Sequence, residues 1–290
     1  MSVIIASRFI HFAAAMILFG GLGFDFLLRR PPGIASSASF RRAITLVMRG
    51  AAVAAALSAL TWLMFEAVNM SGETNAAFDP ATLWLVLSDT SFGVVWLWRM
   101  IAVVALTAVL FIDDERLFVV RLTLAALMLA SLGLVGHAAM EDGAFGLAHQ
   151  ANHAVHLLAT GGWVGGLLPL AIFLRTDAGV HSIEAAKRFS AFGAIAVAAV
   201  LLSGALNSWF LLNSAADLTN TAYGRLLLVK ILLVGVMLGF ALFHRFVLLP
   251  RVQAGMWGLA RFRRSILAEI AVALAVLGIV SVLGTWPPQV

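Results

Sequence analysis

Histidines are the residues of this sequence that could do chemistry, and three of them stand close together. The segment HQANHAVHLLATGGWVGGLLPL begins at His149 and contains His153 and His156. Their spacings of four and three residues place the imidazoles on neighbouring positions of one helix face, provided that the helix begins early enough. Neutral imidazole is a ligand of copper, zinc, nickel and iron. The spacing therefore predicts a transition-metal site at the entrance to a hydrophobic segment.

Further possible ligands lie elsewhere in the chain. His137 and Met140 stand three residues apart in GHAAM, and His11 lies in the first hydrophobic run. The chain has no cysteine, so thiolate sites and disulfides are excluded. Because a thioether additionally favours Cu(I), the candidate metal ligands are His11, His137, Met140, His149, His153 and His156. The alternative is that these histidines have no ligand role, His149 and His153 being solvated at a membrane surface.

The elements that must position these side chains are membrane-spanning helices. Hydrophobic residues make up 62% of the 290 residues, charged residues only 11%, and the mean hydropathy is +1.01. Runs of roughly 20 apolar residues are long enough to cross a bilayer. We predict an all-α integral membrane protein that forms a single domain over residues 1–290. Its eight expected spans cover about 3–28, 43–70, 91–112, 117–137, 151–174, 189–213, 224–249 and 265–286.

The distribution of Lys and Arg over the loops predicts the membrane topology. Fifteen of the 19 basic residues lie on alternate loops, after the first, third, fifth and seventh spans, whereas residues 71–90, 138–150 and 214–223 contain no Lys or Arg. The positive-inside rule then places both termini outside the cytoplasm, with the basic loops inside. On this topology His11, His137, His149, His153 and His156 all lie toward the outer side. The net charge of +5 is thus a topology signal, and we expect no nucleic-acid partner.

The two halves of the sequence resemble each other. A shift of 145 residues superposes His11 on His156 and Gly20-Gly21 on Gly165-Gly166, and a shift of 131 superposes TSFGVVWLWR (90–99) on TAYGRLLLVK (221–230). The longer loop after span two, in which DPATLWLVLSD could form a short interfacial helix, would account for the different shifts. We predict two parallel four-helix repeats, about 1–142 and 143–290. Chance similarity between apolar segments is the alternative.

Charged residues inside the spans are expensive and are treated as functional candidates. We expect Arg99 and Lys230 to pair with carboxylates or helix-end carbonyls, with Glu66 a possible partner, and Glu269 to form a structural ion pair near the inner surface. No P-loop, Rossmann fingerprint or Ser-His-Asp arrangement is visible. We therefore expect neither an ATP-driven pump nor an enzyme.

A family resemblance is carried by GHAAM, HAVHLLATGGWVGGLLPL, KRFSAFGAIAV, SGALNSW, YGRLLLVKILLV, RRSILAEIAV and GTWPP. In this order they resemble the pattern of the bacterial CopD (copper resistance protein D) family, most densely over residues 130–288. His137 and His156 match positions expected from that family. One departure is FHRFVLLP, where His244 stands in place of a typical Asn, which leaves open an inner exit ligand or no role at all.

The resemblance implies an inner-membrane protein of copper homeostasis or resistance that moves copper, as Cu(I) or Cu(II), from the periplasm toward the cytoplasm. Its expected partners are the copper ion, a periplasmic copper-binding protein of the CopC type, and membrane lipid. Two alternatives stay open. His11 and His156, at similar depths, could be axial haem ligands of an electron-transfer protein, or the protein could bind copper for assembly without transporting it.

Overall fold

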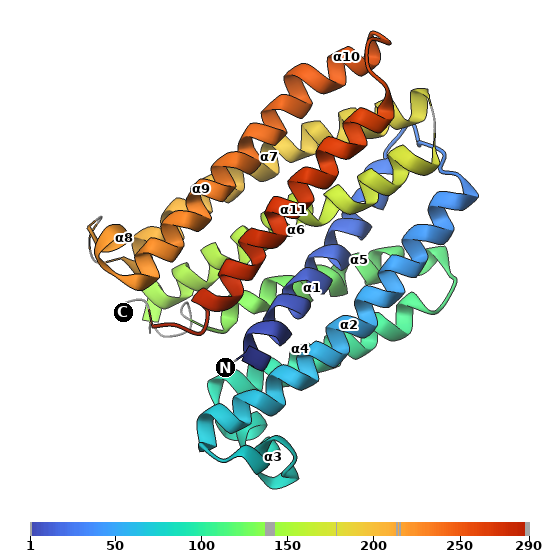
Figure 1. Ribbon diagram of the computed structural model, residues 1–290. Helices are drawn as coiled ribbons and strands as arrows, with labels where there is room; N and C mark the ends of the chain where they lie inside the picture. Colours follow the sequence, from blue (N-terminus) through green and yellow to red (C-terminus); the bar gives the residue numbers. More distant parts are fainter. Residues whose placement is uncertain (1, 137–142, 178, 213, 215, 288–290) are drawn as a thin grey trace.

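The computed structural model describes residues 2–136, 143–177, 179–212, 214 and 216–287 (Figure 1), and the regular structure of these residues is helical throughout. The long helices are α1 (Ser2–Arg29), α2 (Ala38–Ser71), α4 (Ser91–Leu110), α5 (Phe118–Ala130), α6 (Gly143–Thr176), α7 (Val180–Leu211), α9 (Ala222–Phe243) and α11 (Leu259–Leu283). Shorter helices are η1 (Thr74–Ala77), α3 (Pro80–Asp89), η2 (Glu115–Leu117), η3 (Ser131–Leu134), α8 (Asp217–Asn220), the π-helix η5 (His244–Leu248) and α10 (Leu249–Gln253).

The prediction of eight spans is confirmed. Eight helical segments of the described chain are long and apolar enough to cross a membrane, α5 being extended by η2 and η3, and α9 by η5 and α10. The main difference lies at α6, which begins at Gly143, eight residues before the apolar run that marks it in the sequence. His149 and His153 are therefore inside a helix, as the predicted one-face arrangement requires.

The short helix after span two is also confirmed. α3 begins at Pro80, and Asp79 caps it by accepting hydrogen bonds from the backbone N–H groups of Ala81 and Thr82. Hydrogen bonds from the hydroxyl and backbone of Thr82 hold the pKa of Asp79 below its usual value. The cap explains why the helix starts where the sequence reads DPAT.

α1 and α6 lie side by side in the middle of the bundle (Figure 1). α2, α4 and α5 contact α1 or one another on one side, whereas α7, α9 and α11 gather on the other. The links that follow α1, α4, α6 and α10 lie at one end of the bundle, here named the basic end. The start of α1 and the end of α11 lie toward the opposite end, and the end of α11 packs near α8.

The crossing of α1 and α6 depends on two glycines. A Cβ atom added to Gly20 would overlap the backbone of Gly165, and one added to Gly165 would overlap the carbonyl of Met16. Both residues are helical, and the missing side chains allow the two backbones to touch. Because lipid is as apolar as leucine, close packing of this kind contributes more to helix association in a membrane than hydrophobicity does.

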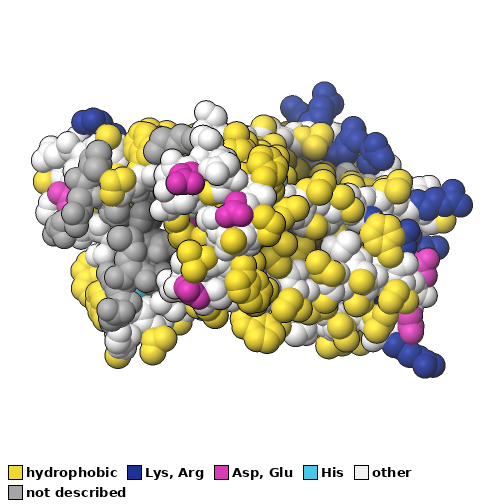
Figure 2. Space-filling view, turned by 90° about the horizontal axis from the view of Figure 1, so that it is seen from below, with side chains coloured by type: hydrophobic (Ala, Val, Ile, Leu, Met, Phe, Trp, Pro, Cys, Tyr) yellow, Lys and Arg dark blue, Asp and Glu magenta, His cyan; other side chains and the backbone are white. Residues whose placement is uncertain are grey.

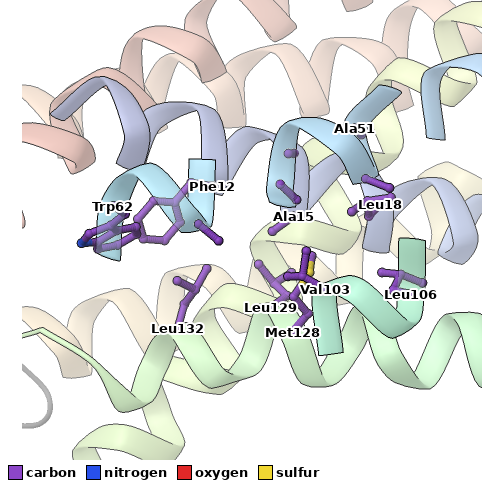
Figure 3. Close-up of a cluster of buried hydrophobic side chains, with 14 of the residues drawn as sticks. Phe12, Ala15, Leu18, Ala51, Trp62, Val103, Leu106, Met128, Leu129 and Leu132 are labelled. Atoms are coloured by element: carbon purple, nitrogen blue, oxygen red, sulfur yellow. The ribbon is translucent and has the colours of Figure 1, made fainter. Parts of the chain in front are cut away.

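Two apolar clusters flank this crossing. One fills the space between the helices of the first half (Figure 3), where Leu18 of α1, Ala51 of α2, Leu106 of α4 and Met128 of α5 are all buried. The second lies toward the basic end, mainly between α6, α7, η5 and α11, and includes Phe173, Leu248 and Ile266.

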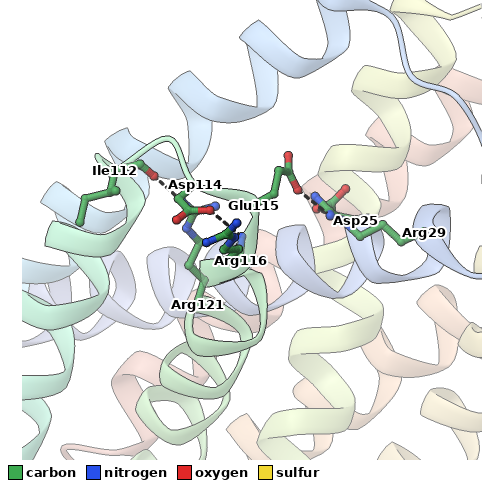
Figure 4. Close-up of polar contacts among 7 residues, drawn as sticks. All are labelled: Asp25, Arg29, Ile112, Asp114, Glu115, Arg116 and Arg121. Carbon is green, nitrogen blue, oxygen red and sulfur yellow. Dashed lines mark hydrogen bonds and ion pairs between the residues drawn. The ribbon is translucent and has the colours of Figure 1, made fainter.

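The basic end carries a network of ion pairs. Most of the Lys and Arg side chains on the face shown in Figure 2 gather there, at the right of the view. Arg29 of α1 pairs with Asp25 at 2.9 Å and with Glu115 of η2 at 2.6 Å, and Arg121 donates to the carbonyl of Ile112 (Figure 4). These contacts attach α1 to the link between α4 and α5.

Candidate metal-binding site

His156 of α6 is held by a serine of the neighbouring helix α7. Its Nδ1 lies 2.9 Å from the Ser203 hydroxyl oxygen, and that hydroxyl donates its single proton to the carbonyl of Ala199 at 2.5 Å. Ser203 must therefore accept from His156, which assigns the imidazole proton to Nδ1. Nε2 then carries the lone pair, and within the described part of the chain no residue hydrogen-bonds to it.

This arrangement is the one that metal-ligating histidines use. A second hydrogen bond through the other ring nitrogen fixes the tautomer and aims the lone pair. The ring also lies against Gly204, whose added Cβ would be 3.4 Å from Cε1 of His156. Lys230 of α9 and His153 are close enough to interact electrostatically with His156. His156 is thus oriented by α7 and has polar neighbours from α6 and α9.

A second polar contact between α6 and α7 lies beside this one. The amide nitrogen of Asn152 donates to the carbonyl of Ser203 at 2.9 Å and to the side-chain oxygen of Asn207 at 2.8 Å. These bonds fix the register of the two helices one turn from His156. The sequence analysis gave Asn152 no role, although its spacing of four from His156 could have indicated one.

His149 and His153 occupy the two turns of α6 before His156. His149 is 1% exposed and stacks on Phe210 of α7, with ring centroids 4.5 Å apart and planes at 14°. His153 is half-buried. The structure therefore places His149 between helices, and the alternative of a solvated interfacial histidine does not describe its surroundings.

His11 has both ring nitrogens engaged. Nδ1 lies 3.1 Å from the Ser58 hydroxyl and 3.1 Å from the carbonyl of Ala55, and Nε2 lies 2.5 Å from the guanidinium of Arg99. Since Ser58 donates its proton to the Ala54 carbonyl at 2.6 Å, the His11 proton is on Nδ1 and the Nε2 lone pair accepts from Arg99. A metal could use His11 only after this last bond is broken.

Among the described residues, Arg99 has no carboxylate partner. It also donates to the carbonyl of Met128, in the last turn of α5, and to the hydroxyl of Ser131 at 2.6 Å. The expected pairing with a helix-end carbonyl is confirmed. The other possible partner, Glu66, acts electrostatically on Arg8, whose guanidinium lies over the ring of Trp62.

The surroundings of His11 and His156 correspond position by position. Ser58 and Ser203 differ by the same 145 residues as the two histidines, and Arg99 and Lys230 differ by 131. Thr90 and Thr221 likewise cap α4 and α9 through the same hydrogen bond, to the backbone N–H groups of Gly93 and Gly224. These correspondences support the two parallel repeats, which stay a prediction.

The remaining predicted ligands are only partly located. His137 and Met140 lie outside the described residues. Within the described ranges, no group of three or more His, Cys, Asp or Glu side chains is placed to hold a metal ion. The ligand set therefore stays a prediction, with His156 the member whose geometry suits it best.

A bundle of eight apolar helices, with imidazoles and cations buried between them, defines a polytopic membrane protein with a polar site near one surface. The chain belongs to the copper resistance protein D family. The model of the "Copper resistance protein D-like, N-terminal domain" matches residues 1–147, and that of "Copper resistance protein D" matches residues 183–283.

Three curated relatives cover most of the chain. The inner membrane protein YebZ of Escherichia coli (strain K12) is 33% identical, with 98% of both chains covered. The copper resistance protein D of Pseudomonas syringae pv. tomato is 32% identical over 98% of this chain and 96% of its own. The copper transport protein CutJ of Bacillus subtilis (strain 168) is 28% identical over 83% of this chain and 45% of its own. No solved structure matches.

Proposed function

We propose that this protein carries copper across the bacterial inner membrane, from the periplasm toward the cytoplasm. The single observation that supports this best is the geometry of His156, whose Nδ1–H is fixed by Ser203 and whose Nε2 lone pair is not used by another described residue. Family membership supports copper as the cargo, since relatives bear the names copper resistance protein D and copper transport protein. The name of the Escherichia coli relative supports the inner membrane as the location.

The basic residues support the direction. If the basic end faces the cytoplasm, both termini are periplasmic and α6 enters the membrane from the periplasm. His149 and His153 would then be the first imidazoles that an incoming ion meets along α6, and His156 the next. His137 and Met140 would complete the capture site from the preceding loop, with Met140 favouring Cu(I).

Copper uptake into proteoliposomes tests the proposal. The purified protein is reconstituted and the entry of copper is followed for the wild type and for His156→Ala. We expect uptake by the wild type and its loss in the variant, because removal of the imidazole removes the oriented lone pair. The matched control is His181→Ala, in an exposed position at the start of α7, which should leave uptake unchanged.

Two other results would favour the alternatives. Copper binding without uptake would indicate a protein that holds the ion for assembly, and addition of a periplasmic copper-binding protein of the CopC type would then test for transfer between the two. A Soret band in the purified protein would indicate haem. The haem hypothesis would need the Nε2 lone pair of His11 as an axial ligand, and this lone pair already accepts a hydrogen bond from Arg99.

A further inference from the structure

A histidine and a glutamate pair inside the membrane near the basic end, away from the histidines of α6. His244 begins the π-helix η5, and Glu269 lies in α11. Nδ1 of His244 is 3.2 Å from a carboxylate oxygen of Glu269, and Nε2 is 2.8 Å from the hydroxyl oxygen of Ser265. Glu269 thus faces a histidine, and the pair is ionic only when His244 is protonated.

The pair is enclosed. Glu269 is 0% exposed, and neither of its oxygens accepts a hydrogen bond from the described residues. The His244 ring packs against Phe240 at 6.0 Å and Phe262 at 5.4 Å between centroids. The side chain of His244, 11% exposed, is the only part of the pair with access to the surroundings.

The Arg and Asp side chains near the pair have other partners. Arg245 donates to Ser190 of α7, and Arg251 and Arg261 lie over the ring of Trp257. Arg188 donates to backbone carbonyls at the end of α1 and just after it. On α1, Asp25 pairs with Arg29, and Asp177 after α6 accepts from Ser37. Among the described residues, no lysine or arginine forms an ion pair with Glu269.

Burial then determines how many protons the pair holds. An ionised carboxylate without a cation is costly in a low-dielectric interior, and so is an imidazolium without an anion. One shared proton leaves the pair neutral overall, either as carboxylate with imidazolium or as carboxylic acid with imidazole. Ser265 suits both forms, because Nε2 carries a proton in each when the shared proton lies between Nδ1 and the carboxyl group, and the hydroxyl oxygen accepts from it.

We propose that His244 and Glu269 form a proton-binding site, reached from the basic end through His244, whose loading is coupled to copper movement. The proposal rests on the transport function proposed above. Buried carboxylates and histidines inside spans are the groups that proton-coupled transporters use. η5 adds a local reason, because single-turn π-helices occur frequently at functional sites.

Proton flux is the direct test. Proteoliposomes contain a trapped pH-sensitive dye, and copper is added outside while copper entry and internal pH are recorded together. We expect copper entry by the wild type to be accompanied by a pH change that Glu269→Gln abolishes. The matched control is Ser281→Ala, which removes another buried polar group of α11 and should leave the pH change intact. Copper entry without any pH change would overturn the coupling and leave the proposed transport standing.

Proton binding can be measured even if the protein transports nothing. Infrared difference spectra recorded over a range of pH report the carbonyl band of a protonated carboxylic acid. We expect a pH-dependent band in the wild type and its absence in Glu269→Gln. His244→Asn removes the imidazole that shares the proton with the carboxyl group, so the pH dependence seen in the wild type should be lost. A wild-type band that does not change with pH would overturn the proton site.

Discussion

Arg99 of α4 donates to Nε2 of His11 at 2.5 Å, and this hydrogen bond distinguishes the two halves of the protein. The corresponding Lys230 makes no such bond to His156 among the described contacts. A guanidinium has several donors in a rigid fork, and Arg99 uses them to join α1, α5 and η3. We therefore assign Arg99 a structural role and expect copper chemistry to depend on His156.

Replacement of this arginine should reduce stability more than transport. Arg99→Lys keeps the charge but cannot reach Met128, Ser131 and His11 together, so buried acceptors lose their donors at a cost of about 1–3 kcal/mol each. We expect a fall of several degrees in Tm in thermal unfolding of the detergent-solubilised protein. Arg225→Lys, at an exposed position of α9, is the control. An unchanged Tm for Arg99→Lys would contradict the structural role.

The two serines provide a matched pair of substitutions. Ser203→Ala removes the acceptor that fixes the tautomer of His156, and loss of such an outer partner typically costs 10–100-fold in metal affinity. Ser58→Ala removes the same interaction from His11 and should leave copper affinity unchanged. Competition with a chelator of known Cu(I) affinity measures both. Equal losses in the two variants would show that both histidines hold the ion.

Gly204 tests the position of the His156 ring. Its added Cβ would meet Cε1 of His156 at 3.4 Å, so the branched side chain of Gly204→Val should push the ring away from Ser203. We expect weaker copper binding with the helix retained by circular dichroism. Gly193→Val on the same helix is the control, because nothing lies within 4 Å of a Cβ at that position. Unchanged binding by Gly204→Val would argue against a role for this ring orientation.

The contact between α1 and α6 should tolerate no side chain. Gly20→Ala places a methyl group against the backbone of Gly165, which cannot rotate away, and overpacking of this kind typically costs about 1–3 kcal/mol or more. We expect a lower Tm or loss of folded protein in size-exclusion chromatography. Gly23→Ala, three residues further along α1 with nothing within 4 Å, should be neutral. Similar behaviour of the two variants would refute the assigned contact.

The eight spans and the short helix α3 could be predicted from the sequence because each depends on residues that are close together in the chain. Each span has enough consecutive apolar residues to be recognised separately, and DPATLWLVLSD contains its own cap and its own proline. The start of α6 was missed because residues 143–150 are only weakly apolar. Helix bounds that depend on capping or packing are not encoded in hydropathy alone.

The site was only partly predictable because its contacts connect distant residues. The shifts of 145 and 131 aligned His11 with His156 and Arg99 with Lys230, but sequence comparison cannot show that Arg99 reaches His11 across 88 positions. Ser58 and Ser203 also align at the shift of 145, although nothing else in the sequence indicated their role. Their role depends on which group donates in each hydrogen bond between hydroxyl and imidazole, and this follows from the three-dimensional contacts of the hydroxyl groups.

The glycine crossing has a mechanical consequence. Gly20 and Gly165 lie nine residues after His11 and His156, about 13 Å along their helices, whereas the His244 ring packs against Phe262 of the second cluster. The backbones of α1 and α6 touch at Gly20 and Gly165 and cannot move closer there, so any rocking of one helix against the other turns about this contact. Such a motion would leave the contacts of His156 with Ser203 and of His244 with Glu269 intact, because each pair lies within residues 143–290.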